Sequence, residues 1–120
     1  MHLREIIALT EACILSPEPD FDREVRSGFA SDLMSDVLRY DVTHGLLITG
    51  LTNPQIIRTA EMADLTAVLL VRGKTPLPET AALACQAGIP ILGTECTMFE
   101  ACGRLYAHGL PACKRYTNDV

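Results

Sequence analysis

The sequence predicts a single three-layer α/β/α domain built on a mostly parallel sheet of about 4–5 strands. Three short apolar runs, GLLITG, AVLLVRG and IPILGT, begin at positions 45, 67 and 89, so they recur every 22 residues. Runs of this length, bounded by Gly and Pro, are typical of strands buried on both faces of a parallel sheet. A helical pattern follows each run, and parallel strands joined by a helix almost always form right-handed crossovers.

Each of the three helical patterns carries its own start or stop signal. Asn53 suits the N-cap of the first helix, and Pro54 suits its first position. The second pattern, PETAALACQAG, ends at Gly88, a natural C-terminal stop. Thr97 and Glu100 stand at capping-box spacing at the start of the third. The second half of the chain is therefore predicted to consist of repeated units, each of one strand, one tight turn and one helix.

The first half of the chain is less regular. We expect a short amino-terminal helix, strands near 12–15 and 25–30, and then a helix capped by Ser31. The side chains of these two helices that we expect to point inward are Leu3, Ile6, Ile7, Leu33, Met34, Val37 and Leu38. This half is expected to extend the same sheet, and an antiparallel edge strand is one arrangement that would allow it.

Composition limits the class of protein. Hydrophobic residues make up 48% of the 120 residues and charged residues 21%, which is ordinary for one folded domain. We assign residues 1–113 to that domain and residues 114–120 to a polar tail. The net charge of -5 and the scattered cations argue against binding to nucleic acid.

Hydropathy and cysteine content indicate the compartment. The longest apolar stretch, residues 67–71, is far too short to span a membrane, so a cytoplasmic protein without membrane contact is the expectation. Five cysteines, an odd number without a CxxC pair, fit reduced thiols better than a disulfide framework. We expect most of them to be small core residues.

One stretch resembles the end of a nucleotide-binding phosphate loop, because Gly73, Lys74 and Thr75 are consecutive. The full motif also needs a glycine at position 68, where this chain has Val68 inside an expected strand. Prolines follow soon after the threonine, where the helix of the motif should begin. The stretch is therefore not an ATP-cleaving loop.

The sequence contains no pattern typical of a metal site or of a catalytic nucleophile. Cys96, Cys102, His108 and Cys113 lie within 18 residues, but their spacings of six, six and five do not match a zinc site. No serine sits in a nucleophile-elbow glycine pattern, and the three histidines fall near a terminus, a turn and a helix end. We expect no catalytic residues, no metal and no cofactor.

The carboxyl ends of the three repeat strands offer the strongest candidate site, because ligands gather at this edge of open parallel sheets. The turns that meet there carry hydroxyls, helix N-termini and two cations, which could hold an anionic ligand such as a nucleotide phosphate. The candidate ligand-binding residues are Ser31, Asp32, Thr49, Thr52, Asn53, Arg72, Lys74, Thr94 and Thr97. Arg72 and Lys74 would supply charge, Ser31 and Asp32 a helix-terminal contact, and the others hydrogen bonds. The alternative is that the hydroxyls only cap helices and the cations only keep the surface soluble.

The order of these pieces resembles the DRTGG domain family. The resemblance rests on REVRSGFASDLMSDVL, on GLLITGLTNPQII and on the stretch from LTAVLLVRGKTPLPETAA to CTMFEACGRLY, and it covers about Leu3 to Leu110. The family is similar to the amino-terminal domain of HPr kinase/phosphorylase and to the regulatory domain of some phosphotransacetylases, with a fold like the MurF N-domain. This chain has Leu51 and Thr52 where the family name expects Asp-Arg, and Arg72-Gly73-Lys74 where it expects Thr-Gly-Gly.

The resemblance implies a regulatory or ligand-sensing domain that is not itself catalytic and forms a homodimer. Its ligand would be a nucleotide or a phosphorylated metabolite. The alternative is a protein-interaction adaptor with no small ligand, which would act through its helix faces or through its tail, CKRYTNDV.

Overall fold

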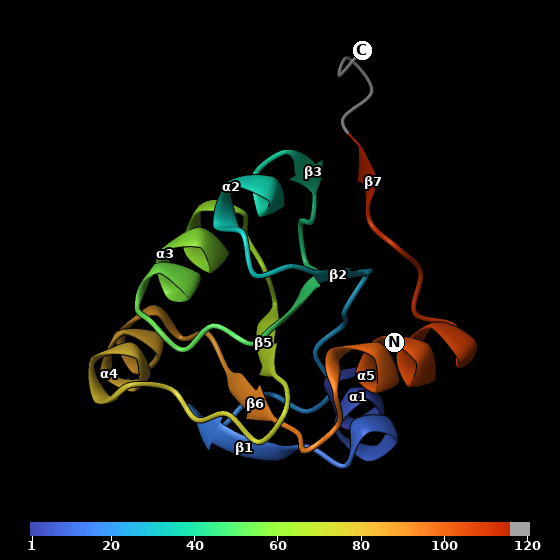
Figure 1. Cartoon of the computed structure of the whole chain (residues 1–120), viewed down its shortest axis with the longest axis horizontal. Coiled ribbons are helices and arrows are strands. Elements are labelled where there is room, and N and C mark those ends of the chain that lie inside the picture. The colour runs from blue at the N-terminus through green and yellow to red at the C-terminus, as the bar shows by residue number, and fades with distance from the viewer. Residues whose placement is uncertain (116–120) are drawn as a thin grey trace.

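A computed structural model describes residues 1–115 and shows five helices arranged around a five-stranded sheet (Figure 1). The elements are α1 (Leu3–Thr10), β1 (Cys13–Ser16), β2 (Gly28–Ala30), α2 (Met34–Val37), β3 (Tyr40–Asp41), β4 (Leu46–Thr49), α3 (Gln55–Met62), β5 (Ala67–Leu70), α4 (Pro78–Ala87), β6 (Ile91–Gly93), α5 (Met98–Ala107) and β7 (Lys114–Arg115).

The sheet has the order β1-β6-β5-β4-β2. Strands β2, β4, β5 and β6 are mutually parallel, with Leu46 opposite Ala67 and Leu69 opposite Leu92. Strand β1 pairs with β6 in the antiparallel direction, so it is the antiparallel edge. These findings confirm the three-layer α/β class and the mostly parallel sheet. Strands β3 and β7 form a separate two-stranded ladder.

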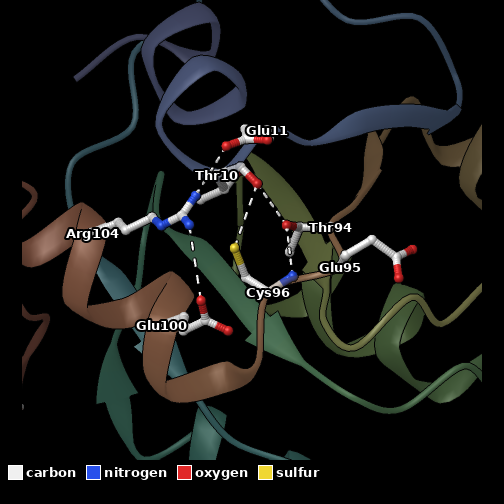
Figure 2. Close-up of a pocket in the computed structure, with 7 residues that line it drawn as sticks. All are labelled: Thr10, Glu11, Thr94, Glu95, Cys96, Glu100 and Arg104. Carbon is white, nitrogen blue, oxygen red and sulfur yellow. Dashed lines mark hydrogen bonds and ion pairs between the residues drawn. The ribbon is translucent and has the colours of Figure 1, made fainter.

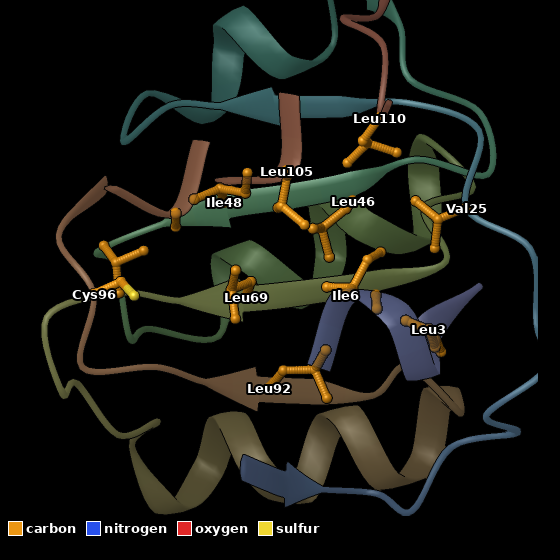
Figure 3. Packing of buried hydrophobic residues seen from close by; sticks show 13 residues of the cluster. Leu3, Ile6, Val25, Leu46, Ile48, Leu69, Leu92, Cys96, Leu105 and Leu110 are labelled. Atoms are coloured by element: carbon orange, nitrogen blue, oxygen red, sulfur yellow. The ribbon is translucent and has the colours of Figure 1, made fainter. Parts of the chain in front are cut away.

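Helices cover both faces of the sheet (Figure 1). Helices α1 and α5 pack on one face, where Leu3, Ile6 and Leu105 join Leu69 and other inward side chains of the strands in one buried cluster (Figure 3). Helices α2, α3 and α4 pack on the opposite face and contribute to a second cluster. Successive residues of a strand point to opposite faces of the sheet, so they belong alternately to the first and to the second cluster.

The local signals at the end of α4 and at the start of α5 work as the sequence predicts. Gly88 ends α4 in the left-handed conformation, with φ of 69°. The Thr97 hydroxyl accepts the Glu100 amide at 3.2 Å and the Glu100 carboxylate accepts the Thr97 amide, so the capping box of α5 is confirmed. At α3 the prediction is off by one residue: the helix starts at Gln55, Pro54 occupies the N-cap rather than the first helical position, and the Asn53 side chain accepts the Gln55 amide from one residue before the cap.

The prediction for the region around α2 is partly wrong. The helix has only four residues, and Ser31 does not cap it, because its hydroxyl accepts the Leu33 amide in a turn that precedes the helix. One helical turn presents only Met34 and Val37 to the core, three residues apart. Leu33 and Leu38 are therefore 57% and 42% exposed rather than inward.

The strand expected over residues 25–30 begins only at Gly28. The residues before it pair with the amino terminus instead, because the Val25 amide donates to the Met1 carbonyl at 2.7 Å and Glu24 forms a bridge with His2. Val25 is nevertheless buried. This long-range contact replaces three residues of expected sheet.

The expectation that most cysteines are core residues is also wrong. Only Cys96 is buried, Cys102 and Cys113 are half-buried, and Cys13 and Cys85 are exposed. Cys13 lies in the edge strand β1, and Cys85 lies on α4. All five are free thiols.

The segment after α5 returns along the outer edge of the sheet. The Gly28 amide donates to the Pro111 carbonyl at 2.9 Å, and the Cys113 amide donates to the Gly28 carbonyl at 3.4 Å. Lys114 and Arg115, the first residues of the expected polar tail, form β7 beside β3. The rest of that tail lies outside the described residues. Among residues 1–115 no helix has the length and apolar character needed to cross a bilayer.

Replacing Leu69 tests the central position of β5 in the core. Leu69 is fully buried, so Leu69→Ala is expected to lower the free energy of unfolding by about 2–5 kcal/mol through lost burial and a cavity. The matched substitution Leu33→Ala, at a leucine that is 57% exposed, is expected to change it by less than about 0.5 kcal/mol. Urea denaturation followed by circular dichroism measures both, and equal losses would contradict the described core.

Candidate functional site

All of the candidate ligand-binding residues lie at one edge of the sheet. Each follows or ends one of the parallel strands β2, β4, β5 and β6, whose carboxyl ends lie side by side. The loops involved are residues 31–33, 50–54, 71–77 and 94–97. The structure brings the candidates together as the sequence predicts, but it uses their side chains in different ways.

Asp32 ties two of these loops together. Its Oδ1 accepts the Thr49 hydroxyl and the Gly50 amide, both at 2.8 Å, and the Thr49 hydroxyl in turn accepts the Leu51 amide. The Gly50 amide lowers the pKa of Asp32, assisted by the Thr49 hydroxyl and the positive charge of Arg72 and opposed by partial burial. Asp32 therefore remains a carboxylate that fastens the end of β4.

Residues 71–74 form a tight turn that extends the pairing of β5 with β6. Arg72 and Gly73 both have left-handed backbones, with φ of 58° and 66°, and the Lys74 amide donates to the Val71 carbonyl. The Arg72 amide donates to the Cys96 carbonyl and the Gly73 amide to the Thr94 carbonyl. Because these three amides already have carbonyl partners, the turn cannot cradle a phosphate as a phosphate loop does.

The side chains of this turn place two cations at the carboxyl edge. The Arg72 guanidinium lies directly against Gly50, where a Cβ atom would collide with it. Lys74 is exposed in the same turn. The Glu95 carboxylate lies against Gly73, since a Cβ there would be 2.9 Å from each of its oxygens. The cations of this edge thus stand beside the two carboxylates of Asp32 and Glu95.

The remaining candidates make hydrogen bonds within the protein. The buried Thr94 hydroxyl donates to the Thr10 carbonyl at 2.6 Å and accepts the Cys96 amide at 3.1 Å. The Thr52 carbonyl accepts the Leu77 amide and the Thr80 hydroxyl, which joins its loop to the start of α4. Thr97 caps α5 and Asn53 accepts the Gln55 amide just before α3, so these polar groups serve the fold, and Arg72 and Lys74 remain as the two cations of the set.

A cavity of about 240 Å³ lies beside this edge, between the end of α1 and the start of α5 (Figure 2). Arg104 crosses it, donating to the Leu9 carbonyl at 3.2 Å and pairing with Glu11 at 3.6 Å and Glu100 at 3.9 Å. With Glu95 also in its lining, the cavity has three carboxylates against one guanidinium. The net negative charge of this lining opposes the binding of an anion.

Sequence reasoning missed this cavity. Of the nine candidate ligand-binding residues only Thr94 lines it. The other walls come from the end of α1, from the loop between β6 and α5 and from α5 itself, and α1 lies far from the other two in the chain. Among residues 1–115 no group of three or more His, Cys, Asp and Glu side chains is placed to hold a metal ion.

Comparison with known proteins gives a likeness in fold to solved structures. No protein-family model and no curated protein matches the sequence. The fold is similar to the crystal structure of the CBS and DRTGG domains of the regulatory region of Clostridium perfringens pyrophosphatase complexed with its activator, diadenosine tetraphosphate. The TM-score is 0.64, the sequence identity is 18%, and the match covers 99% of this chain and 52% of the other. The chain thus spans about half the length of its structural neighbour, and the likeness shows a DRTGG-related fold.

A double-mutant cycle tests the link between Asp32 and Thr49. Asp32→Ala removes the acceptor of a buried hydroxyl and of the Gly50 amide, so we expect a loss of about 1–3 kcal/mol of unfolding free energy. In the Thr49→Val background the same substitution is expected to cost less, because no buried hydroxyl is left without a partner. Additive losses in chemical denaturation would show that the two side chains act independently.

The same carboxylate predicts a pH dependence. The pKa of Asp32 is lower in the folded chain than in the unfolded chain, so its contribution is fully present above about pH 4, the ordinary value for an aspartate. The contribution is lost as the pH falls through the lowered folded pKa. The stability difference between the wild type and Asp32→Asn is therefore expected to be constant near neutral pH and to shrink below about pH 4. Denaturation at a series of pH values measures it, and a difference that grows in acid would contradict the assignment.

Proposed function

We propose that this chain is a non-catalytic regulatory domain that senses a small anionic ligand, such as a nucleotide or a phosphorylated metabolite, and forms a homodimer. The observation that carries the proposal is the turn at residues 71–74, which presents Arg72 and Lys74 at the carboxyl edge of a parallel sheet. The fold of the pyrophosphatase regulatory region, which is complexed with a dinucleotide activator, supports it.

Binding at this turn would depend on side-chain charge. The backbone amides of the turn already donate to carbonyls, so the guanidinium and the ammonium group carry the attraction. Helix α3 starts nearby with Gln55, Ile56 and Ile57, which bear no negative charge, whereas α4 and α5 carry Glu79 and Glu100 in their first turns. The positive end of the α3 dipole therefore adds to the same field.

The exposure of the site limits its affinity. Arg72 and Lys74 both face solvent, where ion pairs are weakened by water and by salt. We therefore expect binding in the micromolar to millimolar range that weakens further as the ionic strength rises. A ligand with several phosphates, which can contact both cations at once, is favoured over a single phosphate.

Removing the two cations tests the site. In a thermal-shift panel of nucleotides and phosphorylated metabolites, a ligand at about 100 times its Kd stabilises the folded wild type by about 2.7 kcal/mol. The double variant Arg72→Ala, Lys74→Ala is expected to lose this ligand-induced shift.

Arg23→Ala is the control for removing a cation away from the site, because Arg23 lies at the opposite end of the domain, beside the end of α3 and Gly88. This variant is expected to keep the shift. An unchanged shift in the double variant would place the ligand elsewhere. A panel without any shift, together with one stoichiometric protein partner recovered by pull-down, would favour the adaptor alternative.

Gly50 provides a second test that keeps both charges. A Cβ at position 50 collides with the end of the Arg72 side chain, which can swing away at little cost. Gly50→Ala is therefore expected to change the free energy of unfolding by less than about 1 kcal/mol while weakening ligand binding about tenfold through displacement of the guanidinium. Titration calorimetry measures the affinity, and unchanged binding would show that the position of Arg72 over Gly50 is not used.

A further inference from the structure

A second cavity lies at the opposite edge of the sheet from the candidate site. It has a volume of about 240 Å³ and sits where the parallel strands β2 and β4 begin, so we call it the amino-end cavity. Arg26 and Ser27 precede β2, Thr43 lies in the loop before β4, and the segment after α5 forms another wall as it runs past β2 to β3 (Figure 1). It shares no lining residue with the cavity between α1 and α5, and none of the nine candidate ligand-binding residues lines it.

The Ser27 hydroxyl is a polar group without a partner. Only 8% of the Ser27 surface is exposed, yet its hydroxyl makes no hydrogen bond within residues 1–115. In that part of the chain, the one hydroxyl that is both unpartnered and completely enclosed belongs to Thr59, so the Ser27 hydroxyl is not sealed off and opens on the cavity that the residue lines. It rests against the backbone of Gly45, where a Cβ atom would be 3.2 Å from it. Buried hydroxyls nearly always have a partner, so this one indicates a place for a bound molecule.

The lining of the amino-end cavity is rich in hydrogen-bond donors. Arg26 and Lys114 form no ion pair among residues 1–115, and the half-buried Thr43 adds a second free hydroxyl. Asp41 is the one carboxylate of the described lining, and it already accepts the Thr43 amide at 3.3 Å. Burial, together with the nearby charge of Asp41, raises the pKa of Cys113, so its thiol is uncharged at neutral pH. Free donors therefore outnumber free acceptors, and two cations face one anion.

This lining favours an oxyanion as the bound molecule. Carboxylate and phosphate oxygens accept hydrogen bonds, and they bind best where guanidinium, ammonium and hydroxyl donors converge. The volume lies below the range of about 300–1,000 Å³ that is typical of pockets for drug-sized ligands, so the cavity suits a small metabolite rather than a dinucleotide. The cavity between α1 and α5 has a similar volume but carries three carboxylates, so it lacks this preference.

The donors are held in place by the sheet. The Arg26 amide donates to the His44 carbonyl at 2.9 Å, and the Ser27 carbonyl accepts the Leu46 amide at 2.8 Å. The backbone of both donor residues is thus anchored to the start of β4. A site whose donors are already in position loses little conformational freedom when a ligand binds.

We propose that the amino-end cavity binds a small oxyanion, a phosphate monoester or a carboxylate. Arg26 and Lys114 supply the charge, and the Ser27 hydroxyl donates a hydrogen bond to an oxygen of the ligand. This site is separate from the carboxyl-edge site of the proposed function and does not depend on it.

Titration of the isotope-labelled whole chain with inorganic phosphate, and separately with succinate, tests the site by NMR. The backbone amide signals of Ser27, Thr43 and Cys113 are expected to shift saturably with at least one of the two anions. The anion with the lower Kd identifies the class of ligand, phosphate monoester or carboxylate. The signals of residues 72–74 report on the carboxyl edge in the same spectra.

Two variants separate binding from folding. Ser27→Ala is expected to raise the Kd of the anion about tenfold, because a hydrogen bond to a charged ligand is lost. The ligand-free variant should melt at the same temperature as the wild type or higher, since no hydrogen bond within residues 1–115 is broken, whereas a hydroxyl that served only the fold would lower it. Arg26→Ala is expected to raise the Kd at least threefold. Arg23→Ala is the matched control, at an exposed arginine that does not line this cavity, and should leave the Kd unchanged.

The absence of saturable shifts at Ser27, Thr43 and Cys113 with both anions would overturn the site. So would a Kd that neither Ser27→Ala nor Arg26→Ala changes. The double variant Arg72→Ala, Lys74→Ala should keep the shifts at these three amides. If the shifts disappear in that variant, the anion binds at the carboxyl edge, and this inference fails while the proposed function stands.

Discussion

The burial of the central strands on both faces is the constraint on which the rest of the structure depends. Every residue of β4 and β5 is buried, and Ala67 to Leu70 have no exposed surface. Exposing the apolar side chains of either face to water would be strongly unfavourable, so helices must cover both faces of the sheet. Each crossover connection returns the chain to the same edge of the sheet, so all the parallel strands start at one edge and end at the other. The shared edge at which their carboxyl ends meet follows from that requirement, before any ligand is considered.

The second half of the chain could be predicted because its signals are local. The glycine that ends α4 and the capping box of α5 act within a few residues of their own positions, as does the hydroxyl-rich turn after β4. The first half could not be predicted in the same detail. The position of Val25 depends on a hydrogen bond to Met1, and the single turn of α2 buries two side chains where a longer helix would have buried four. Tertiary contacts, which the sequence pattern does not show, decide both.

At the candidate site, too, one part could be predicted from the sequence and another part could not. Its place at the carboxyl edge follows from strand order, so the sequence located the loops correctly. The role of each side chain depends on partners from elsewhere, as when the Thr94 hydroxyl binds the Thr10 carbonyl 84 residues away. Likewise, Arg72 adopts a left-handed backbone and reaches over Gly50, although nothing in the adjacent residues indicates it. Spacing alone could not separate hydroxyls that serve the fold from cations that face solvent.

The outer edges of the sheet determine how this domain can meet other chains. At one edge, Pro111 and Cys113 hydrogen-bond to Gly28 of β2. At the other edge, the pairing of the short strand β1 shifts register between Ile14 and Ser16, and Pro17 follows directly after the strand. Proline has no amide hydrogen to donate, and an irregular edge is a poor template for a new strand. Growth by adding strands, which leads from an open sheet to fibres, is thereby discouraged at both ends. Recognition of other molecules is left to helix faces and loop ends, where assembly can stop at a defined number of copies.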